Sequence, residues 1–477
     1  MQTITETTTK PAWTQAILSP PKEFPLTHLE ILSGKIPLGI RGTLYRNGPA
    51  KLERNGERVG HWFDGDGAIL AVHFHENKVT ATYRYVQTKG YLKETQENRF
   101  IYPNYGMTAA GWFGNNLLKP VKNTANTSVL PLPTKLLALW EGGNPHALDL
   151  EDLTTFGTDS LSKLAPGESF SAHPKIDPNT GEIYNFGLVA GRNAKLNIYK
   201  SDPTGNIVQK KTFQLNGIPL IHEFVFAGKY LIFFVSPVRV NLVSVIFGNN
   251  SYSDSLTWKP ELGTEILVID RENLSLVSRS QTDPWFQWHF ANGYVDKEGF
   301  VVTEIVQYPD FKTNQYLQEV ASGKTKTFAP GTLWQIRLNP QSGKVVSREQ
   351  LLERSCEFPV VKASQVGKPW RYTYLSLHRE GVDISRELLG AIARFDHKTN
   401  HLSIADPGKN RYPSELIYVP DSNNSELGWL LTVVYDGNTH TSEVWLYDSD
   451  RLEDPPVCRL GLPSVIPLSF HGAWKPA

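Results

Sequence analysis

Four histidines of this chain lie in apolar, strand-like segments with no cysteine beside them: His173, His222, His289 and His471. None of them has another histidine three or four residues away, so a local helical motif cannot form a metal site from them. Only a fold that brings distant strands to one axis could gather these residues. Imidazole binds iron, copper, zinc and nickel. Four neutral ligands would leave the +2 charge of the ion uncompensated, which favours ferrous iron with positions open for O₂.

Three glutamates lie in apolar or tight-turn segments: Glu141, Glu357 and Glu415. A histidine that binds a metal usually donates its second ring N–H to a carboxylate, and a buried carboxylate requires a partner. These glutamates are therefore candidates to orient the imidazoles. The alternative is a salt bridge between each glutamate and a nearby arginine or lysine.

The composition favours a β-rich protein with a large aromatic interior. The 477 residues include 12 Trp, 22 Phe and 19 Tyr, which favour strands, and 37 Gly and 32 Pro, which favour turns. The 48 acidic and 48 basic side chains give no electrostatic basis for binding nucleic acid. Two cysteines cannot form a disulfide framework and the N-terminal segment has no apolar export signal, so we expect a cytoplasmic protein.

Short apolar runs bounded by turn residues predict strands throughout the chain. The clearest runs span residues 68–74, 78–86, 182–189, 229–235, 265–270, 300–306, 331–338 and 443–448. Many short strands are typical of a sandwich, a barrel or a propeller. We prefer a propeller, because the chain is too long for one sandwich and because the inner strands of a propeller line one axis. No Trp-Asp or kelch repeat supports this choice.

No low-complexity linker divides the chain, which predicts a single domain over residues 1–477, with residues 1–20 as a poorly ordered tail or peripheral segment. Two apolar stretches could touch a membrane surface and collect a lipid-soluble substrate there. They are residues 238–247 and the surroundings of Trp112, Phe113, Leu117 and Leu118. Core packing is the alternative for both stretches.

Ordered motifs over most of the chain resemble the carotenoid cleavage oxygenases, especially the cyanobacterial members that cleave apocarotenoids. The motifs are Leu44-Tyr-Arg-Asn-Gly-Pro49, His61-Trp-Phe-Asp-Gly-Asp-Gly67, Asn123-Thr-Ala-Asn-Thr127, Leu139-Trp-Glu-Gly-Gly143, Ser171-Ala-His-Pro-Lys-Ile-Asp-Pro178, Ile221-His-Glu-Phe224, Cys356-Glu-Phe-Pro359, Glu415-Leu-Ile-Tyr-Val-Pro420 and Phe470-His-Gly472.

The resemblance implies an all-β, seven-bladed β-propeller, with loops and short helices forming a dome over a metal site on the axis. It implies one Fe²⁺ per chain, held by the four histidines named above. Glu141 would hold His222, Glu357 would hold His289 and Glu415 would hold His471, whereas His173 would have no glutamate partner. Thr127 matches a residue whose methyl group crowds one open iron position.

One motif departs from the family pattern. The family usually has two adjacent histidines before an apolar residue and an asparagine, whereas this chain has Trp288-His289-Phe290-Ala291-Asn292. The ligand His289 is kept, but Trp288 stands where Phe is usual and is expected to narrow the substrate tunnel. Trp140 is the other aromatic residue expected to line that tunnel.

The activity that this resemblance implies is oxidative cleavage of a conjugated C=C bond in a carotenoid or apocarotenoid, with O₂ and Fe²⁺, to give aldehydes. Members that cleave stilbenes or isomerise polyenes share the fold and remain alternatives. Stilbene cleavage would be expected to need a polar Tyr/Lys pair, which we do not find. A non-catalytic propeller that binds a ligand is the alternative from another class, and it would need no metal.

Overall fold

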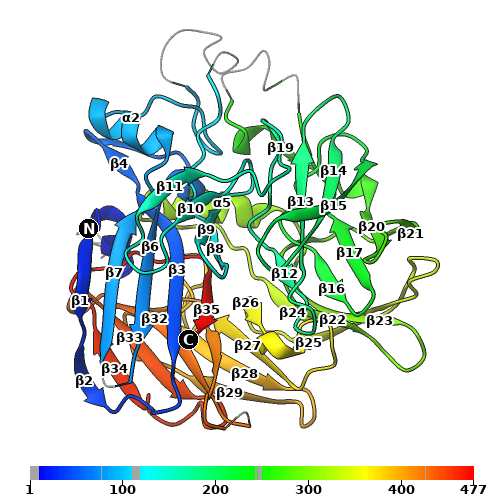
Figure 1. The fold of residues 1–477 in the computed structure, drawn as a ribbon. Coiled ribbons are helices and arrows are strands. Elements are labelled where there is room, and N and C mark those ends of the chain that lie inside the picture. Colours follow the sequence, from blue (N-terminus) through cyan, green and yellow to red (C-terminus); the bar gives the residue numbers. More distant parts are fainter. Residues whose placement is uncertain (1–9, 77, 110–118, 242–243, 245–249, 425) are drawn as a thin grey trace, which may run out of the picture.

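The computed structural model describes residues 10–76, 78–109, 119–241, 244, 250–424 and 426–477. In these ranges the chain forms an all-β propeller with few helices, and its sheets are arranged around a common centre (Figure 1). The helices are short: α1 (Thr14–Leu18), α2 (Lys89–Glu97) and α5 (Lys312–Val320).

All eight apolar runs predicted as strands are confirmed. They form β6 (Asp66–Phe74), β7 (Val79–Tyr85), β13 (Ile183–Val189), β17 (Tyr230–Val235), β20 (Thr264–Asp270), β23 (Val301–Tyr308), β24 (Thr332–Leu338) and β33 (Thr441–Asp448). Three of these strands, β6, β17 and β23, are buried along their whole length, which explains why their sequences are mainly apolar.

Antiparallel pairing of strands that follow one another produces most of the sheets. One sheet has the order β11 (Thr155–Thr158), β10 (His146–Leu148), β9 (Leu136–Leu139) and β8 (Ser128–Pro131). The next have the orders β12 (Lys175–Ile176), β13, β14 (Lys195–Ser201), β15 (Ile207–Gln214), and β16 (Val225–Ala227), β17, β20, β21 (Leu276–Thr282). Two more are β22 (Phe286–Val295), β23, β24, β25 (Val345–Leu352), and β26 (Cys356–Val360), β27 (Tyr372–Leu377), β28 (Ala391–Asp396), β29 (His401–Ala405).

Two further sheets combine strands from opposite ends of the sequence, and we call this arrangement the double clasp. One has the order β1 (Phe24–His28), β7, β6, β3 (Gly42–Lys51) and β35 (Gly472–Pro476). The other has the order β2 (Glu30–Gly34), β34 (Cys458–Gly461), β33, β32 (Gly428–Asp436) and β30 (Arg411–Pro413), with β31 (Ile417–Pro420) also paired to β32. The blue and red strands thus lie side by side in Figure 1.

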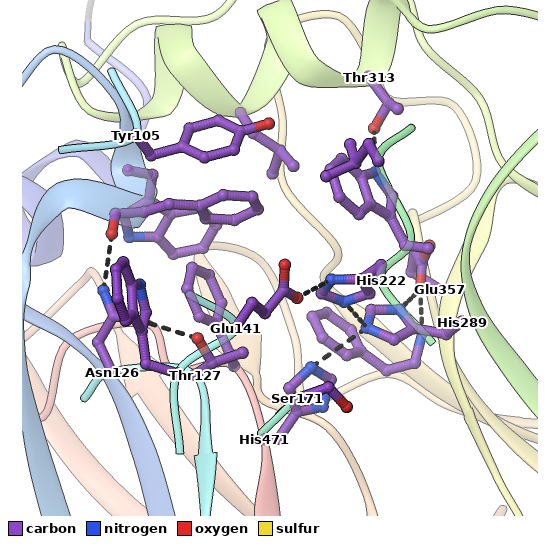
Figure 2. Close-up of a pocket in the computed structure, with 18 of the residues that line it drawn as sticks. Tyr105, Asn126, Thr127, Glu141, Ser171, His222, His289, Thr313, Glu357 and His471 are labelled. Atoms are coloured by element: carbon purple, nitrogen blue, oxygen red, sulfur yellow. Dashed lines mark hydrogen bonds and ion pairs between the residues drawn. The ribbon is translucent and has the colours of Figure 1, made fainter. Parts of the chain in front are cut away.

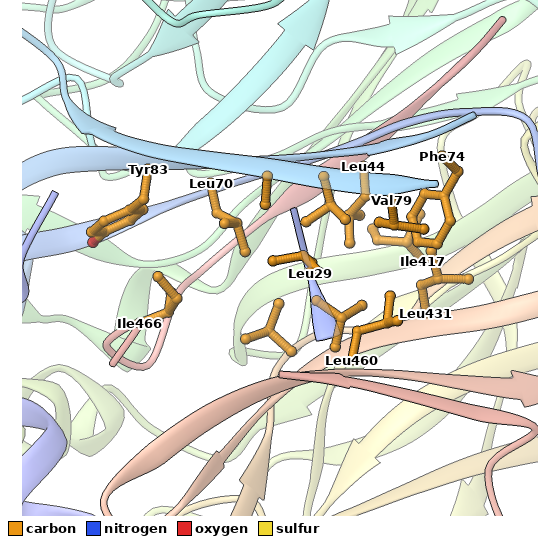
Figure 3. Close-up of a cluster of buried hydrophobic side chains, with 14 of the residues drawn as sticks. Leu29, Leu44, Leu70, Phe74, Val79, Tyr83, Ile417, Leu431, Leu460 and Ile466 are labelled. Carbon is orange, nitrogen blue, oxygen red and sulfur yellow. The ribbon is translucent and has the colours of Figure 1, made fainter. Parts of the chain in front are cut away.

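The two sheets of the double clasp pack face to face over a hydrophobic core (Figure 3). Leu44 and Leu70 come from the β3 and β6 side, and Leu431 and Leu460 come from the β32 and β34 side; all four are fully buried. The double clasp is therefore stabilised by burial of apolar side chains as well as by strand pairing.

The expectation of an N-terminal tail is wrong for residues 13–18, and residues 1–9 lie outside the described residues. Trp13 is fully buried and its indole N–H donates to the carbonyl of Arg386, at 3.0 Å. Ala16 and Ile17 are also buried, so the apolar residues repeat at i, i+3 and i+4 on one turn of helix. This pattern is too short to stand out in the sequence.

Most of the two stretches predicted to touch a membrane lies outside the described residues, including Trp112, Phe113, Leu117 and Leu118. Of the described part, Val238 is fully buried in β18 (Val238–Val240), which pairs with β19 (Leu256–Trp258). Across the described ranges, none of the helices is long and apolar enough to cross a bilayer.

Candidate metal centre and apolar cavity

The four candidate ligands are placed where inner strands of the propeller begin. His173 and His222 lie just before β12 and β16, His289 lies within β22, and His471 directly precedes β35. The strands β12, β16 and β22 are each the first strand of their sheet and lie at its edge. Side chains that are distant in the sequence can therefore meet at the centre of the fold.

The Nε2 atoms of the four imidazoles converge on one point. Figure 2 shows three of these imidazoles, those of His222, His289 and His471, facing one another. The separations are 3.0 Å from His173 to His222, 3.2 Å from His222 to His289 and 3.2 Å from His289 to His471. One nitrogen of each ring lies within 4.8 Å of those of the others. Metal–imidazole bonds of about 2.0–2.1 Å at right angles would place two nitrogens roughly 3 Å apart, so these separations fit a common metal ion.

Three of the imidazoles have a glutamate at Nδ1. Nδ1 of His289 lies 2.6 Å from Glu357, Nδ1 of His471 lies 3.0 Å from Glu415, and Nδ1 of His222 contacts Glu141. An imidazole that donates its Nδ1–H to a carboxylate keeps a lone pair on Nε2. The Nε2 lone pairs then face one another in a buried space, and a cation among them would remove this repulsion. The set of donor atoms therefore fits a divalent metal.

The three glutamates differ in how firmly they are held. Glu357 also accepts the hydroxyl of Tyr308 at 2.9 Å and the backbone N–H of Phe358 at 2.6 Å. Glu415 also accepts the backbone N–H of Gly472 at 2.9 Å. The side chain of Glu141 is 28% exposed and lines the cavity, and its second oxygen points away from His222 (Figure 2).

The electrostatics of the site favour neutral imidazoles at His173 and His471 and anionic carboxylates at Glu357 and Glu415. Burial lowers the pKa of His173 well below its usual value and also lowers that of His471, against the opposing effect of Glu415. Burial also acts against a charged His289, but Glu357 outweighs it and raises the pKa of that imidazole. Burial acts to raise the pKa of Glu357 and Glu415, but their histidine partners outweigh it, so both pKa values lie below the usual range.

A residue that the sequence did not single out packs against two of the imidazoles. Phe358 stacks on His289 with ring centroids 5.2 Å apart, and its ring lies 5.4 Å from that of His471. Its backbone has φ = 53°, in the left-handed region that non-glycine residues rarely adopt. Such strain is concentrated at functional sites. A φ angle of this kind leaves no signal in the sequence.

A cavity of about 500 Å³ opens onto the cluster. Thr127, Trp140, Trp288, Glu141 and Glu357 line it, together with many aromatic and aliphatic side chains. The described residues on its wall include no lysine, arginine or aspartate. A volume of this size, with an apolar wall and few polar groups, is typical of a small-molecule site.

The polar groups on this wall are mostly bonded to the protein. The hydroxyl of Tyr105 donates to Asn314 at 2.7 Å, and the indole N–H of Trp288 donates to Thr313 at 3.0 Å. The hydroxyl of Thr127 donates to Asn126 at 3.1 Å. Trp288 also lies edge-on to His222, with ring centroids 5.0 Å apart, which places it directly beside the imidazole cluster.

Comparison with known proteins identifies the class. Residues 17–476 match the family described as retinal pigment epithelial membrane protein, RPE65. The apocarotenoid-15,15'-oxygenase of Synechocystis sp. is 30% identical over 474 residues, covering 97% of this chain and 96% of the relative. The resveratrol cleavage oxygenase 1 of Aspergillus fumigatus is 26% identical, covering 94% of this chain and 92% of the relative.

A solved structure, that of cobalt-substituted Synechocystis ACO, has a TM-score of 0.88 and 29% identity, and 98% of each chain is covered. The chain therefore belongs to the RPE65/carotenoid oxygenase family, and it is an oxygenase. The resemblance inferred from the sequence motifs is confirmed.

Proposed function

We propose that this protein is a non-haem iron dioxygenase that cleaves one conjugated C=C bond of a carotenoid or apocarotenoid with O₂ and releases two aldehydes. The observation that carries the proposal is the convergence of the four Nε2 atoms beside an apolar cavity of about 500 Å³. The names of the relatives, which include an apocarotenoid-15,15'-oxygenase, support this substrate class.

The four imidazoles would hold Fe²⁺, with Glu141, Glu357 and Glu415 fixing the rings of His222, His289 and His471. A ferrous ion bound there would supply the O₂ chemistry that amino-acid side chains lack. The protein's own part is to exclude water and to hold one double bond of the polyene beside the ion. Thr127 would limit what enters one open position on the ion.

The wall of the cavity supports a polyene over a phenolic stilbene. A phenolate would need a compensating cation, but the described wall has no lysine or arginine. Trp140 and Trp288 would lie along the polyene, and their faces would stabilise a cationic intermediate on it.

We also propose that the blade number is seven. The described strands form seven sheets with at least four strands each, and the two short pairs β4–β5 and β18–β19 would belong to the loops above the axis. β4 spans Glu53–Arg54 and β5 spans Glu57–Arg58.

The test is to incubate the purified, iron-loaded protein in air with one full-length carotenoid, several apocarotenals and a hydroxystilbene, and to identify the products by mass. Paired aldehyde fragments from a carotenoid or apocarotenal would support the proposal and locate the cleaved bond. Cleavage of the stilbene alone would refute the substrate class, and a product of unchanged mass would refute the cleavage reaction. Since His471→Ala removes one ligand, this variant should lose iron and activity together.

A further inference from the structure

Glu223 is a buried carboxylate with no place among the three histidine–glutamate pairs. It follows His222 directly in the sequence, and its side chain is only 4% exposed. A buried carboxylate must be compensated by hydrogen bonds or by a cation. The partners of Glu223 come from two other segments that carry candidate metal ligands.

The first partner lies next to His289. The pairing of β22 with β23 shifts its register between Gln287 and Phe290 and again between Phe290 and Asn292. At such an irregularity the side chains no longer alternate regularly between the two faces of the strand, and the hydrogen bonds between the two strands are interrupted. The backbone N–H of Phe290 donates to Oε2 of Glu223 at 2.7 Å. Glu223 thus fixes the backbone directly beside His289.

The second partner lies near His173. Oε1 of Glu223 pairs with the ammonium group of Lys175, which is two residues after His173 in β12. The same oxygen lies 3.9 Å from Nδ1 of His173, too far for a direct hydrogen bond. His173 is the one candidate ligand with no glutamate at hydrogen-bond distance from its ring.

We propose that Glu223 is a positioning residue that holds the segments of His173, His222 and His289 in one arrangement, so that their imidazoles reach a common ion. The inference rests on the proposed metal site. It adds a fourth carboxylate that acts on the backbone and on a neighbouring lysine, whereas the other three act on the imidazoles themselves.

The role differs from that of an ordinary buried ion pair. Glu443 in β33 is a suitable comparison. Its side chain is 9% exposed and lies 2.8 Å from that of Arg459 in β34, but it contacts none of the four clustered histidines. Removal of either carboxylate leaves a cation without its partner and lowers stability. Only removal of Glu223 should alter the geometry of the metal site.

The experiment measures Co²⁺ binding to the full-length protein, by competition with a chelator and by the visible absorption spectrum of the bound ion. Glu223→Ala should weaken Co²⁺ binding by about 10- to 100-fold, as is usual when an outer partner of a metal ligand is lost, and should shift the spectrum. Glu443→Ala should lower the melting temperature but leave both the affinity and the spectrum unchanged.

A second pair of variants keeps the test decisive if Glu223→Ala does not fold. In a Lys175→Met background, Glu223→Gln can still accept the N–H of Phe290, whereas Glu223→Ala cannot. The glutamine variant should therefore bind Co²⁺ more tightly than the alanine variant, with a spectrum close to that of the wild type. Equal Co²⁺ affinities of the glutamine and alanine variants in this background would overturn the inference but not the proposed function. The same holds if Glu223→Ala binds Co²⁺ as tightly as the wild type. A wild-type protein that binds no Co²⁺ would overturn the proposed function and the inference with it.

Discussion

At the scale of single residues, the three histidine–glutamate pairs are unequal. Glu357 accepts three hydrogen bonds, from His289, Tyr308 and the backbone of Phe358. Among the described residues, Glu141 is paired with His222 alone, and it faces the cavity. The ring of His289 is therefore held by a fixed carboxylate, whereas the ring of His222 is held by a carboxylate with more freedom.

This difference predicts unequal effects on metal binding. Glu357→Gln should weaken Fe²⁺ or Co²⁺ binding by about 10- to 100-fold, because the amide no longer fixes the orientation of the ring. Glu141→Gln should weaken binding less. Chelator competition on both variants checks the order, and a greater loss in Glu141→Gln would contradict it.

The strained backbone at Phe358 predicts that glycine is the less destabilising replacement, although a glycine variant is usually less stable than an alanine variant. Phe358→Ala loses the ring but keeps a Cβ atom at φ = 53°, whereas Phe358→Gly loses the ring and relieves the strain. Glycine should therefore give the more stable protein, by about 1 kcal/mol, because a residue with a Cβ atom is penalised in the left-handed region. Unfolding in urea compares the two variants, and a less stable glycine variant would show that the backbone is not strained.

The four histidines could be chosen from the sequence because each lies in an apolar segment, and the resemblance to the carotenoid cleavage oxygenases assigned a glutamate to three of them. The structure places the four chosen histidines in one cluster and brings each predicted glutamate to its histidine. Phe358 and Glu223 could not be found in this way. Their roles depend on a left-handed φ angle and on a register shift in β22, neither of which follows from local residue types.

At the scale of secondary-structure elements, four buried charges join α2 and the segment after residue 119 to β6. Lys122 lies 2.6 Å from Asp66 and 2.6 Å from Glu94, and Arg54 lies 2.6 Å from Asp66 and 3.5 Å from Glu94. All four side chains are at most 2% exposed. The same segment continues to Asn126 and Thr127 on the wall of the cavity, so this network positions part of the site.

Lys122→Met should therefore destabilise the protein strongly, because it leaves a buried carboxylate without enough positive charge. The expected loss in the free energy of unfolding is about 3–5 kcal/mol. Lys93→Met is the control, because Lys93 pairs with Glu97 at the surface and is 49% exposed. The control should lose less than about 1 kcal/mol. Similar losses in the two variants would show that the buried network is not specifically stabilising.

Asp64 should make stability depend on pH in the opposite direction from a salt-bridged carboxylate. Burial raises its pKa from 3.8 to about 7, and the N–H groups of Gly106 and His61 offset only part of this effect. The folded protein then holds this proton more tightly than the unfolded chain does. The stability contributed by Asp64 is complete below pH 3.8 and is lost as the pH rises to about 7.

Asp64→Asn should remove that dependence. The difference in unfolding free energy between wild type and variant should change by at most about 1.4 kcal/mol per pH unit between these two pKa values. Urea unfolding of both proteins across this range measures it. A difference that does not vary with pH would contradict the prediction.

Long, buried strands could be predicted from their apolar runs, but several strands that position the site could not. β12 has two residues, and β10 and β16 have three each. Segments this short carry no periodicity, and they become strands only because a longer neighbour pairs with them. The single turn of α1 was missed for the same reason.

At the scale of the whole molecule, the double clasp joins segments more than 400 residues apart. β3 pairs with β35 from Gly42–Pro476 to Arg46–Gly472, and β2 pairs with β34 from Glu30–Gly461 to Gly34–Cys458. A propeller could be inferred from the length of the chain and from the expected convergence of distant residues on one axis, but this closure could not. The sequence of a strand indicates which residues are buried, whereas its partner depends on the path of the entire chain.

The double clasp also positions His471, a candidate metal ligand. This residue directly precedes β35, and its carbonyl accepts the N–H of Asn47 in β3, at 2.9 Å. Deletion of residues 472–477 keeps all four histidines but removes this strand. Saturating metal should raise the melting temperature of the wild type, since an ion that binds only the folded state stabilises it by about 2.7 kcal/mol at 100 times its Kd. The deletion variant should show little of this increase, and an equal increase would show that the clasp is not needed for the site.

Synthesis proceeds from the N-terminus, so β2 and β3 leave the ribosome long before β34 and β35 exist. During that interval one edge of β3 has no partner, and three of the four histidines are present without the last. His471 follows with β35, the strand that completes the sheet containing β3. The pairing of β35 with β3 therefore completes this sheet and, in the same step, brings the fourth imidazole to the other three.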